Sequence, residues 1–312
     1  MQYAAVEAEP WSWLPHPEVW MVVLGVVALG GYVARVIAPK VPAASRGGDG
    51  VPAISPAQKR WFVLGVVLLW LAADWPLHDL AEQYLYWLHM FQHFVLTLVI
   101  PPVFWLATPR WLAEFALPTG SRGRKVLRSF ARPVPAAVIF NALIVATHWA
   151  ALVNASVENA AVHYTVHLVV VSGAFLMWIP VCGPFAEMRM QPVPTCIYLF
   201  MQSIIPTVPG AWLTLAEYPV YGAYDNTFRL WGISIIEDQQ FAGLFMKLGG
   251  GSFLWAVIIV VFFRYALGHE RDQHRYNLVR LEDGIDYVPE AKASAPSDPA
   301  RSDPAPPVTL PG

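Results

Sequence analysis

Long apolar stretches alternate with short polar segments along this 312-residue chain. An apolar run of about 18 or more residues is long enough to cross the hydrocarbon core of a bilayer as a helix. The pattern therefore predicts an all-α integral membrane protein with seven transmembrane helices. The expected helices are about Val19–Ala38, Trp61–Trp75, Leu85–Pro109, Ala136–Val153, Ala160–Cys182, Thr195–Leu215 and Gln240–Leu267.

Prolines and glycines interrupt several of these stretches. Pro101 and Pro102 lie in the third stretch, where the missing backbone donors predict a kink or an end of the helix. The sixth stretch contains two further prolines, and the seventh contains Gly249–Gly251. Three consecutive glycines permit close helix packing or a bend.

Composition supports membrane insertion and suggests how the chain is divided. The chain is 56% hydrophobic and only 13% charged, whereas soluble domains carry about 25% charged residues. Two cysteines exclude an extensive disulfide framework. No basic residue precedes the first apolar run, which is not the pattern of a cleaved signal peptide. We expect an outer arm (1–18), a membrane domain (19–267) and a cytoplasmic tail (268–312), disordered from about residue 289.

The positions of the basic residues predict the orientation. The loops after the first, third and fifth stretches, together with the tail, hold 18 of the 20 Lys and Arg residues when Arg35 and Arg264, at the ends of the neighbouring stretches, are counted with them. The exceptions are Arg229 and Lys247. Because basic loops remain on the cytoplasmic side, we expect the N-terminus outside and the C-terminus inside. The expected location is a plasma membrane, with the lipid bilayer as a partner and no nucleic acid.

Two histidine pairs are the candidate functional residues. His89 and His93 lie four residues apart in the third stretch, and His163 and His167 repeat this spacing in the fifth. A spacing of four places both side chains on one helix face. Ionisable groups inside a membrane are costly and therefore indicate function. With His148 near the end of the fourth stretch, five imidazoles share one depth, roughly 5–10 Å below the outer surface at 1.5 Å per residue.

A metal site is the leading interpretation of these histidines. Imidazole is a good ligand for copper, zinc, iron and nickel, and two histidines at i and i+4 can chelate one ion. His148 is a possible further ligand, and Asp238 or Glu237 is the expected acceptor that fixes an imidazole tautomer.

Other residues have simpler interpretations. His16 and His78 are expected to be hydrogen-bonded packing residues, and the two cysteines to be small buried side chains. Met90, Met177, Met201 and Met246 are too scattered in sequence to predict a copper box.

Four ordered motifs carry a resemblance to a known family. They are LHMFQHFVLTLVIPP from Leu88, HYTVHLVVVSGAFLMWIPVCGP from His163, GAWLTLAEYPVY from Gly210 and EDQQFAGLFMKLGGG from Glu237. With these motifs the chain resembles the CtaG-type cytochrome c oxidase assembly factors, which are seven-span bacterial membrane proteins. The resemblance covers roughly residues 61–267.

The resemblance implies a role in maturing a haem–copper oxidase by supplying or inserting copper. The positions it carries over are His89, His93, His148, His163, His167, Asp238 and Gln239. The chain departs from the family pattern at Lys247, where relatives tend to have an aromatic or apolar residue. It also has a short N-terminal arm without a fused copper-transport domain.

We therefore expect a copper-binding assembly factor whose site faces the extracytoplasmic side and whose partner is an oxidase subunit. On this interpretation the protein is not an enzyme. One alternative is a b-type membrane cytochrome, with a histidine from each pair holding haem iron. The other is a metal- or proton-coupled transporter, which would need a polar path across the whole membrane.

Overall fold

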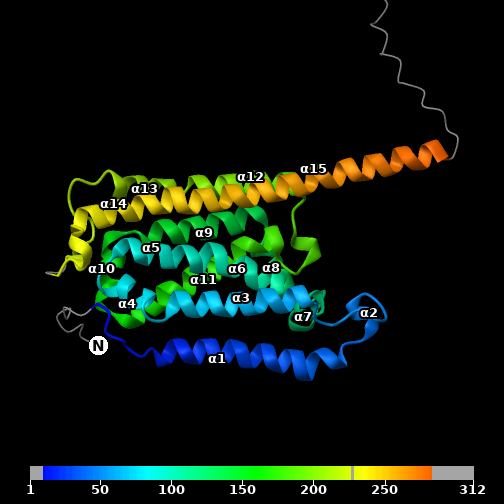
Figure 1. Cartoon of the computed structure of the whole chain (residues 1–312), viewed down its shortest axis with the longest axis horizontal. Coiled ribbons are helices and arrows are strands. Elements are labelled where there is room, and N and C mark those ends of the chain that lie inside the picture. The colour runs from blue at the N-terminus through cyan, green and yellow to red at the C-terminus, as the bar shows by residue number, and fades with distance from the viewer. Residues whose placement is uncertain (1–9, 226–227, 283–312) are drawn as a thin grey trace, which may run out of the picture. The chain divides into compact units, whose positions relative to one another are not determined.

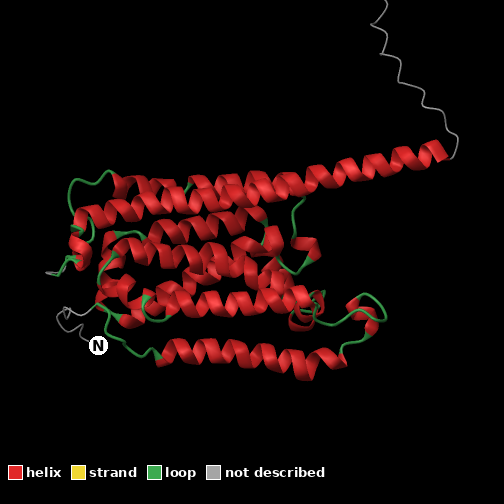
Figure 2. Cartoon of the chain, in the orientation of Figure 1, coloured by secondary structure: helices red, strands yellow, loops and turns green. Residues whose placement is uncertain are grey.

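The computed structural model describes residues 10–225 and 228–282, with residues 272–282 as helix backbone alone. These residues form helices and connecting loops, and no strand occurs among them (Figure 2). The all-α expectation is confirmed. Six helical runs are long and apolar enough to cross a membrane, and a bent helix pair makes a seventh if it is counted as one span. The chain is thus a multi-pass membrane protein with six or seven candidate spans.

Figure 1 shows the order of the elements. The first half of the chain forms α1 (Pro17–Tyr32), η1 (Val33–Ile37), η2 (Ala38–Lys40), α2 (Ala43–Arg46), α3 (Pro56–Ala73), α4 (Leu77–Gln83), α5 (Tyr86–Phe94), η3 (Val95–Val99), α6 (Ile100–Ala107), α7 (Arg110–Ala116), α8 (Arg122–Phe130) and α9 (Pro133–Thr147). The second half forms α10 (Ala150–Glu158), α11 (Ala160–Cys182), η4 (Ala186–Met188), α12 (Pro192–Ile204), α13 (Thr207–Thr214), η5 (Gly222–Tyr224), η6 (Leu230–Gly232), α14 (Ile235–Phe245), η7 (Met246–Gly250) and α15 (Gly251–Glu282).

The fourth span differs from the expected Ala136–Val153. Helix α9 ends at Thr147, because His148 leaves the helical conformation and Trp149 is extended. A separate helix, α10, then begins at Ala150. At its N-terminal end, α9 follows the basic helix α8 after a bend of 69°. The basic segment that we expected to be a loop therefore contains two helices, α7 and α8.

The third span continues through its two prolines. Residues 95–99 form a turn of π-helix, and α6 follows directly with Pro101 in its first turn. Pro101 has no N–H to offer to the preceding turn. Instead, Trp178 of α11 donates its indole N–H to the carbonyl of Thr97 at 3.2 Å. The span is thus tied to α11 at the position where its own hydrogen bonding is weakest.

The sixth and seventh spans are also interrupted. The sixth breaks at residues 205–206 into α12 and α13, as its prolines suggest. The seventh passes from α14 through a π-helical turn, η7, into α15. Helix α15 runs without a break past residue 267 to Glu282. The tail expected to be disordered, from about residue 289, lies outside the described residues.

Helices α13 and α14 approach each other closely at two glycines. A Cβ atom added at Gly243 would lie 2.6 Å from the hydroxyl oxygen of Thr214 and 2.7 Å from its backbone nitrogen. A Cβ added at Gly210 would lie 3.0 Å from the carbonyl oxygen of Gly243. Small residues at this crossing let the two backbones pack together, as is common in membrane proteins.

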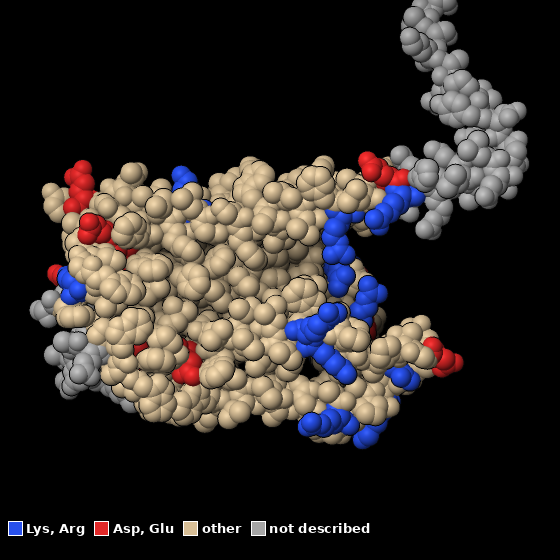
Figure 3. All heavy atoms as spheres, viewed as in Figure 1, with Lys and Arg blue, Asp and Glu red and all other residues tan. Residues whose placement is uncertain are grey.

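The two ends of the helical bundle differ in charge. Helices α4 and α10 lie at one end, and α2 and α7 lie at the other (Figure 1). On the face shown in Figure 3, most Lys and Arg side chains gather at the end with α2, α7 and α8. The histidine-bearing starts of α5 and α11 lie toward the opposite end (Figure 1).

The glycine crossing yields a stability prediction. Gly243→Ala places a methyl group against the backbone of α13, and such overpacking typically costs about 1–3 kcal/mol. We expect a lower midpoint of thermal unfolding in detergent. Gly25→Ala is the matched control, because no atom lies within 4 Å of its added Cβ. Equal midpoints for the two variants would show that the crossing has room for a side chain.

Candidate metal centre

A carboxylate from α14 fixes the start of the first histidine helix. The two oxygens of Asp238 accept hydrogen bonds from the backbone N–H groups of Tyr86 at 2.7 Å and Trp87 at 3.0 Å. These N–H groups belong to the first turn of α5 and have no partner within the helix. A negative charge at this N-terminus also interacts favourably with the helix dipole. Asp238 therefore sets the position from which α5 presents His89 and His93.

The second histidine helix has its own cap. The side-chain oxygen of Asn159 accepts hydrogen bonds from the N–H groups of Ala161 at 2.9 Å and Val162 at 3.3 Å. Helix α11 starts immediately afterwards and carries His163 and His167 one turn apart. Both histidine pairs thus lie near the N-terminus of a capped helix.

The structure brings the four histidines of the two pairs together. The ring centroids of His89 and His93 are 4.6 Å apart, and those of His163 and His167 are 4.3 Å apart. Between the helices, the centroids of His93 and His167 are 4.5 Å apart. His89 and His163 are buried, and the other two rings are partly buried. We call these residues the four-histidine cluster.

A buried carboxylate completes the cluster. One oxygen of Glu82, near the end of α4, lies 3.0 Å from Nδ1 of His89 and 3.3 Å from Nε2 of His163. Glu82 is only 8% exposed. Since an ionised carboxylate only accepts hydrogen bonds, it fixes the proton of His89 on Nδ1 and leaves the Nε2 lone pair available. This is the arrangement in which a histidine binds a metal ion.

Two overlapping ligand sets result. His89, His93 and His167 each offer one nitrogen, and these three atoms lie within 4.8 Å of one another. Glu82, His163 and His167 form a second set within the same limit. Among the described residues, Nε2 of His167 is buried and has no hydrogen-bond partner. A buried polar atom without a partner is costly, and an ion shared by the two sets would satisfy it.

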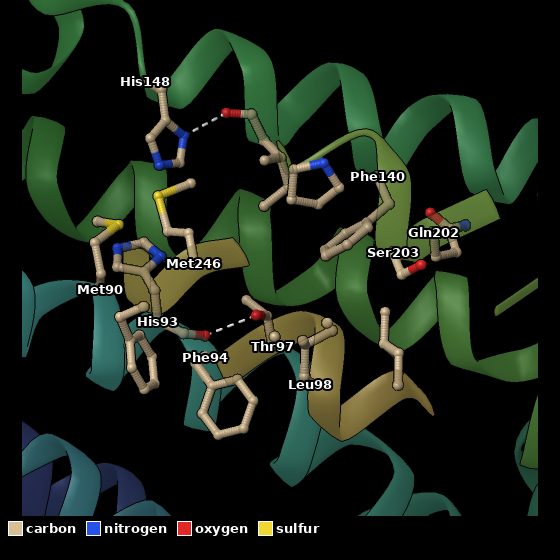
Figure 4. Close-up of a pocket in the computed structure, with 16 residues that line it drawn as sticks. Met90, His93, Phe94, Thr97, Leu98, Phe140, His148, Gln202, Ser203 and Met246 are labelled. Carbon is tan, nitrogen blue, oxygen red and sulfur yellow. Dashed lines mark hydrogen bonds between the residues drawn. The ribbon is translucent and has the colours of Figure 1, made fainter. Parts of the chain in front are cut away.

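His148, the fifth predicted ligand, lies outside both sets. Its Nδ1 donates to the carbonyl oxygen of Ile144 at 2.7 Å. Its own carbonyl oxygen accepts a hydrogen bond from the hydroxyl of Tyr221 at 2.9 Å. The ring faces a cavity that His93 also lines (Figure 4). The structure therefore places His148 next to the cluster but separates it from the four close-packed rings.

The three residues expected to support the imidazoles bind elsewhere. Asp238 caps α5, as described above. Gln239 accepts from the N–H of Val220 at 2.8 Å and donates to the carbonyl of Tyr221 at 3.0 Å. Glu237 is exposed and forms a capping box with Ser234 at the start of α14. They hold the surrounding backbone, and Glu82 is the residue that contacts the imidazoles.

Glu82, which lies between the second and third predicted helices, is the residue that the sequence interpretation missed. A signal for it was present, because Glu82, His89 and His93 have spacings of seven and four. In a continuous helix these spacings place three residues on one face. The chain in fact breaks at residues 84–85 between α4 and α5, and still brings Glu82 to His89.

His16 and His78 form a separate polar group near the cluster. Nε2 of His16 lies 2.7 Å from an oxygen of Asp79, and its Nδ1 lies 3.4 Å from Glu18. The ring of His78 lies 4.8 Å from that of His16 and contacts the side-chain amide of Gln92 at 3.1 Å. The expectation that these two histidines are hydrogen-bonded is confirmed.

Comparison with known proteins identifies the family. The model of the cytochrome c oxidase caa3 assembly factor family (Caa3_CtaG) matches residues 30–266, which include the whole cluster. No curated protein matches the chain. No solved structure matches it either.

The pair of His16 and Asp79 predicts a pH-dependent stability. The hydrogen bond to Asp79 raises the pKa of His16 above its ordinary value of 6.5 and outweighs the opposing effect of burial. A folded-state pKa above the unfolded value means that the stabilisation is complete below about pH 6.5 and is lost as the pH rises through the folded-state pKa. The destabilisation caused by His16→Gln should therefore be larger at about pH 5.5 than at about pH 8.5.

Thermal unfolding of the wild type and the variant at both pH values measures this difference. Asp79→Asn is the control, because removing the carboxylate should reduce the wild-type pH dependence in the same way. A His16→Gln effect that is constant between the two pH values would contradict the charged pair.

Proposed function

The chain belongs to the cytochrome c oxidase caa3 assembly factor family, and we propose that it binds copper at the four-histidine cluster with Glu82. In this proposal the protein passes the ion to a subunit of a haem–copper oxidase. The ion is cargo, and the protein has no catalytic step.

The carboxylate of Glu82 between His89 and His163 is the observation that supports the proposal most directly. A metal ion surrounded only by neutral imidazoles would leave its whole charge in an apolar region, which is costly. One carboxylate neutralises a monovalent ion completely and half the charge of a divalent ion. The unpartnered Nε2 of His167 adds a ready donor atom at the centre of the site.

The donor set suits copper. Imidazole nitrogens with a single carboxylate oxygen form a ligand set of borderline softness, which binds copper and zinc in preference to magnesium or calcium. Copper(II) binds most strongly in the divalent series, so a site of this type retains it against competing ions. The family's role in assembling an oxidase supports copper over zinc as the cargo.

We further propose that the cluster faces the extracytoplasmic side of a bacterial plasma membrane. Basic residues gather at one end of the bundle (Figure 3), and the histidine-bearing starts of α5 and α11 lie toward the other end (Figure 1). The positive-inside rule places the basic end in the cytoplasm. The N-terminal arm (1–18) would then lie outside and the segment 268–312 inside, with 19–267 as the membrane domain.

The geometry favours copper over haem. The rings of the cluster pack with centroid separations of 4.3–6.0 Å, and Glu82 occupies the space between His89 and His163. The cavity beside the cluster has a volume of about 80 Å³. Sites for drug-sized ligands typically have about 300–1,000 Å³. A porphyrin would require these helices to move apart.

Replacing the ligands should remove copper without unfolding the protein. We expect the variant His163→Ala/His167→Ala to lose the copper bound at the four-histidine cluster and to abolish maturation of the oxidase in cells. Glu82→Gln keeps a hydrogen-bond acceptor but removes the charge, and should lower copper affinity by about 10- to 100-fold. Elemental analysis of the purified protein and oxidase activity of the variant strain are the measurements.

Thr165→Val is the matched control. Thr165 lies between the two histidines on the same helix, is exposed, and donates only to the carbonyl of Ala161 at 2.7 Å. This variant should bind copper and mature the oxidase normally. Unchanged copper content and normal oxidase activity in the double histidine variant would reject the proposed function. A Soret band that the double variant loses would instead identify a haem protein.

A further inference from the structure

His148 presents a lone pair into a cavity. Its Nδ1–H is committed to the carbonyl of Ile144, so Nε2 carries no proton in the neutral ring. This Nε2 is buried and, within the part of the chain that the structure describes, has no hydrogen-bond partner. The hydroxyl of Tyr221 donates a hydrogen bond to the backbone carbonyl of His148. A fixed, buried nitrogen donor without a partner is a feature that a bound ion would explain.

Two methionine side chains line the cavity that this nitrogen faces. Met90 and Met246 line the same cavity as His93 and His148. Figure 4 shows the sulfur of Met246 beside the ring of His148 and the sulfur of Met90 beside the ring of His93. The two methionines come from different helical segments, α5 and η7. Met90 belongs to a buried hydrophobic cluster, and Met246 packs against that cluster. Because Met90 and Met246 are far apart in sequence, the sequence pattern gives no sign that they share a cavity.

We propose that His148, Met90, Met246 and His93 form a second metal site, which binds a monovalent soft ion and in cells binds copper(I). We call it the thioether site. The proposal deepens the proposed function, because it gives the copper cargo a second position next to the four-histidine cluster. His93 belongs to both sites.

The ligand chemistry selects the charge of the ion. Thioether sulfur is soft and uncharged, and it favours copper(I) over zinc and divalent copper. The remainder of the cavity wall is mainly aromatic and aliphatic, and includes Phe94, Phe140 and Leu254. Four neutral donors leave the full charge of the ion in this apolar region, and the cost rises steeply with charge. A monovalent ion is therefore the occupant that these ligands can hold.

The shared ligand provides a route between the sites. Copper(I) held by His93 in the cluster would exchange its bonds to His89 and His167 for bonds to the two sulfurs and to His148. The oxidation state does not change, and no proton moves because all the exchanged ligands are neutral. The ion leaves the carboxylate of Glu82 behind and enters an uncharged site.

The backbone around the methionine is irregular. Met246 is the first residue of the π-helical turn η7, and His93 lies two residues before the π-helical turn η3. Such turns are uncommon in helices and often mark functional sites. They widen the helix locally. Here one such turn contains Met246 and the other follows His93, and both residues line the same cavity.

X-ray absorption on the full-length protein tests the thioether site. Purified wild type in detergent is loaded with copper(I) without oxygen, and scattering from sulfur neighbours is recorded at the copper edge. We expect a sulfur signal in the wild type and its loss in Met90→Leu/Met246→Leu. Leucine conserves methionine volume, so the fold should be retained. A wild-type spectrum with nitrogen and oxygen scattering alone overturns the proposal without reference to any variant.

Two controls identify the source of sulfur. Met201→Leu changes an exposed methionine of α12 and should keep the signal. Cys182→Ala/Cys196→Ala should keep it too, and its loss there would assign the sulfur to the cysteines and overturn the proposal. A sulfur signal that persists in Met90→Leu/Met246→Leu has the same consequence.

The cluster variant separates this inference from the proposed function. His163→Ala/His167→Ala leaves every ligand of the thioether site in place, so its sulfur signal should remain when copper(I) is added. If this variant keeps the signal and also supports normal oxidase maturation, the proposed function fails and the thioether site stands. If it loses maturation while Met90→Leu/Met246→Leu leaves the wild-type sulfur signal unchanged, the function stands and the thioether site fails.

Discussion

The buried carboxylate of Glu82 is the constraint on which the centre of this protein depends. A carboxylate inside a membrane domain is tolerated only when positive or hydrogen-bonding groups surround it. Here the surrounding groups are imidazoles from two other helices, at 3.0 Å and 3.3 Å. The carboxylate holds His89 in one tautomer and supplies the only acidic oxygen of the ligand sets among the described residues. Without it, four neutral rings would be a much weaker site for a cation.

Several unrelated contacts place the helices so that this arrangement is possible. Asp238 caps α5, and Trp178 joins α11 to the turn that contains Thr97. The close crossing of α13 and α14 at Gly243 positions the helix that carries Asp238. The histidines therefore rest on a frame of backbone hydrogen bonds, and substitutions in that frame affect the site without contacting an ion.

The cluster and the thioether site would differ in charge as well as in ligand type. The four-histidine cluster contains the carboxylate of Glu82, which can neutralise part or all of the charge of an ion. The other contains only uncharged sulfur and nitrogen donors. Its electrostatic attraction for a monovalent ion is weaker, but its soft sulfur ligands select copper(I). A carrier must bind its cargo firmly and still release it. Two adjacent sites with one common ligand, His93, would provide both properties within a single protein.

The sequence by itself determined the class of the molecule and the identity of the four clustered histidines. Apolar stretches specify membrane helices because burial in lipid depends on composition, and a spacing of four specifies a shared helix face. The tertiary structure decided the rest. It brought Glu82 across a helix break, assigned Asp238 and Gln239 to backbone groups, and separated His148 from the cluster. It also joined Met90 and Met246, which are far apart in sequence. Periodicity reports only the face on which a residue lies, whereas contacts between helices depend on crossings, caps and irregular turns that no local pattern encodes.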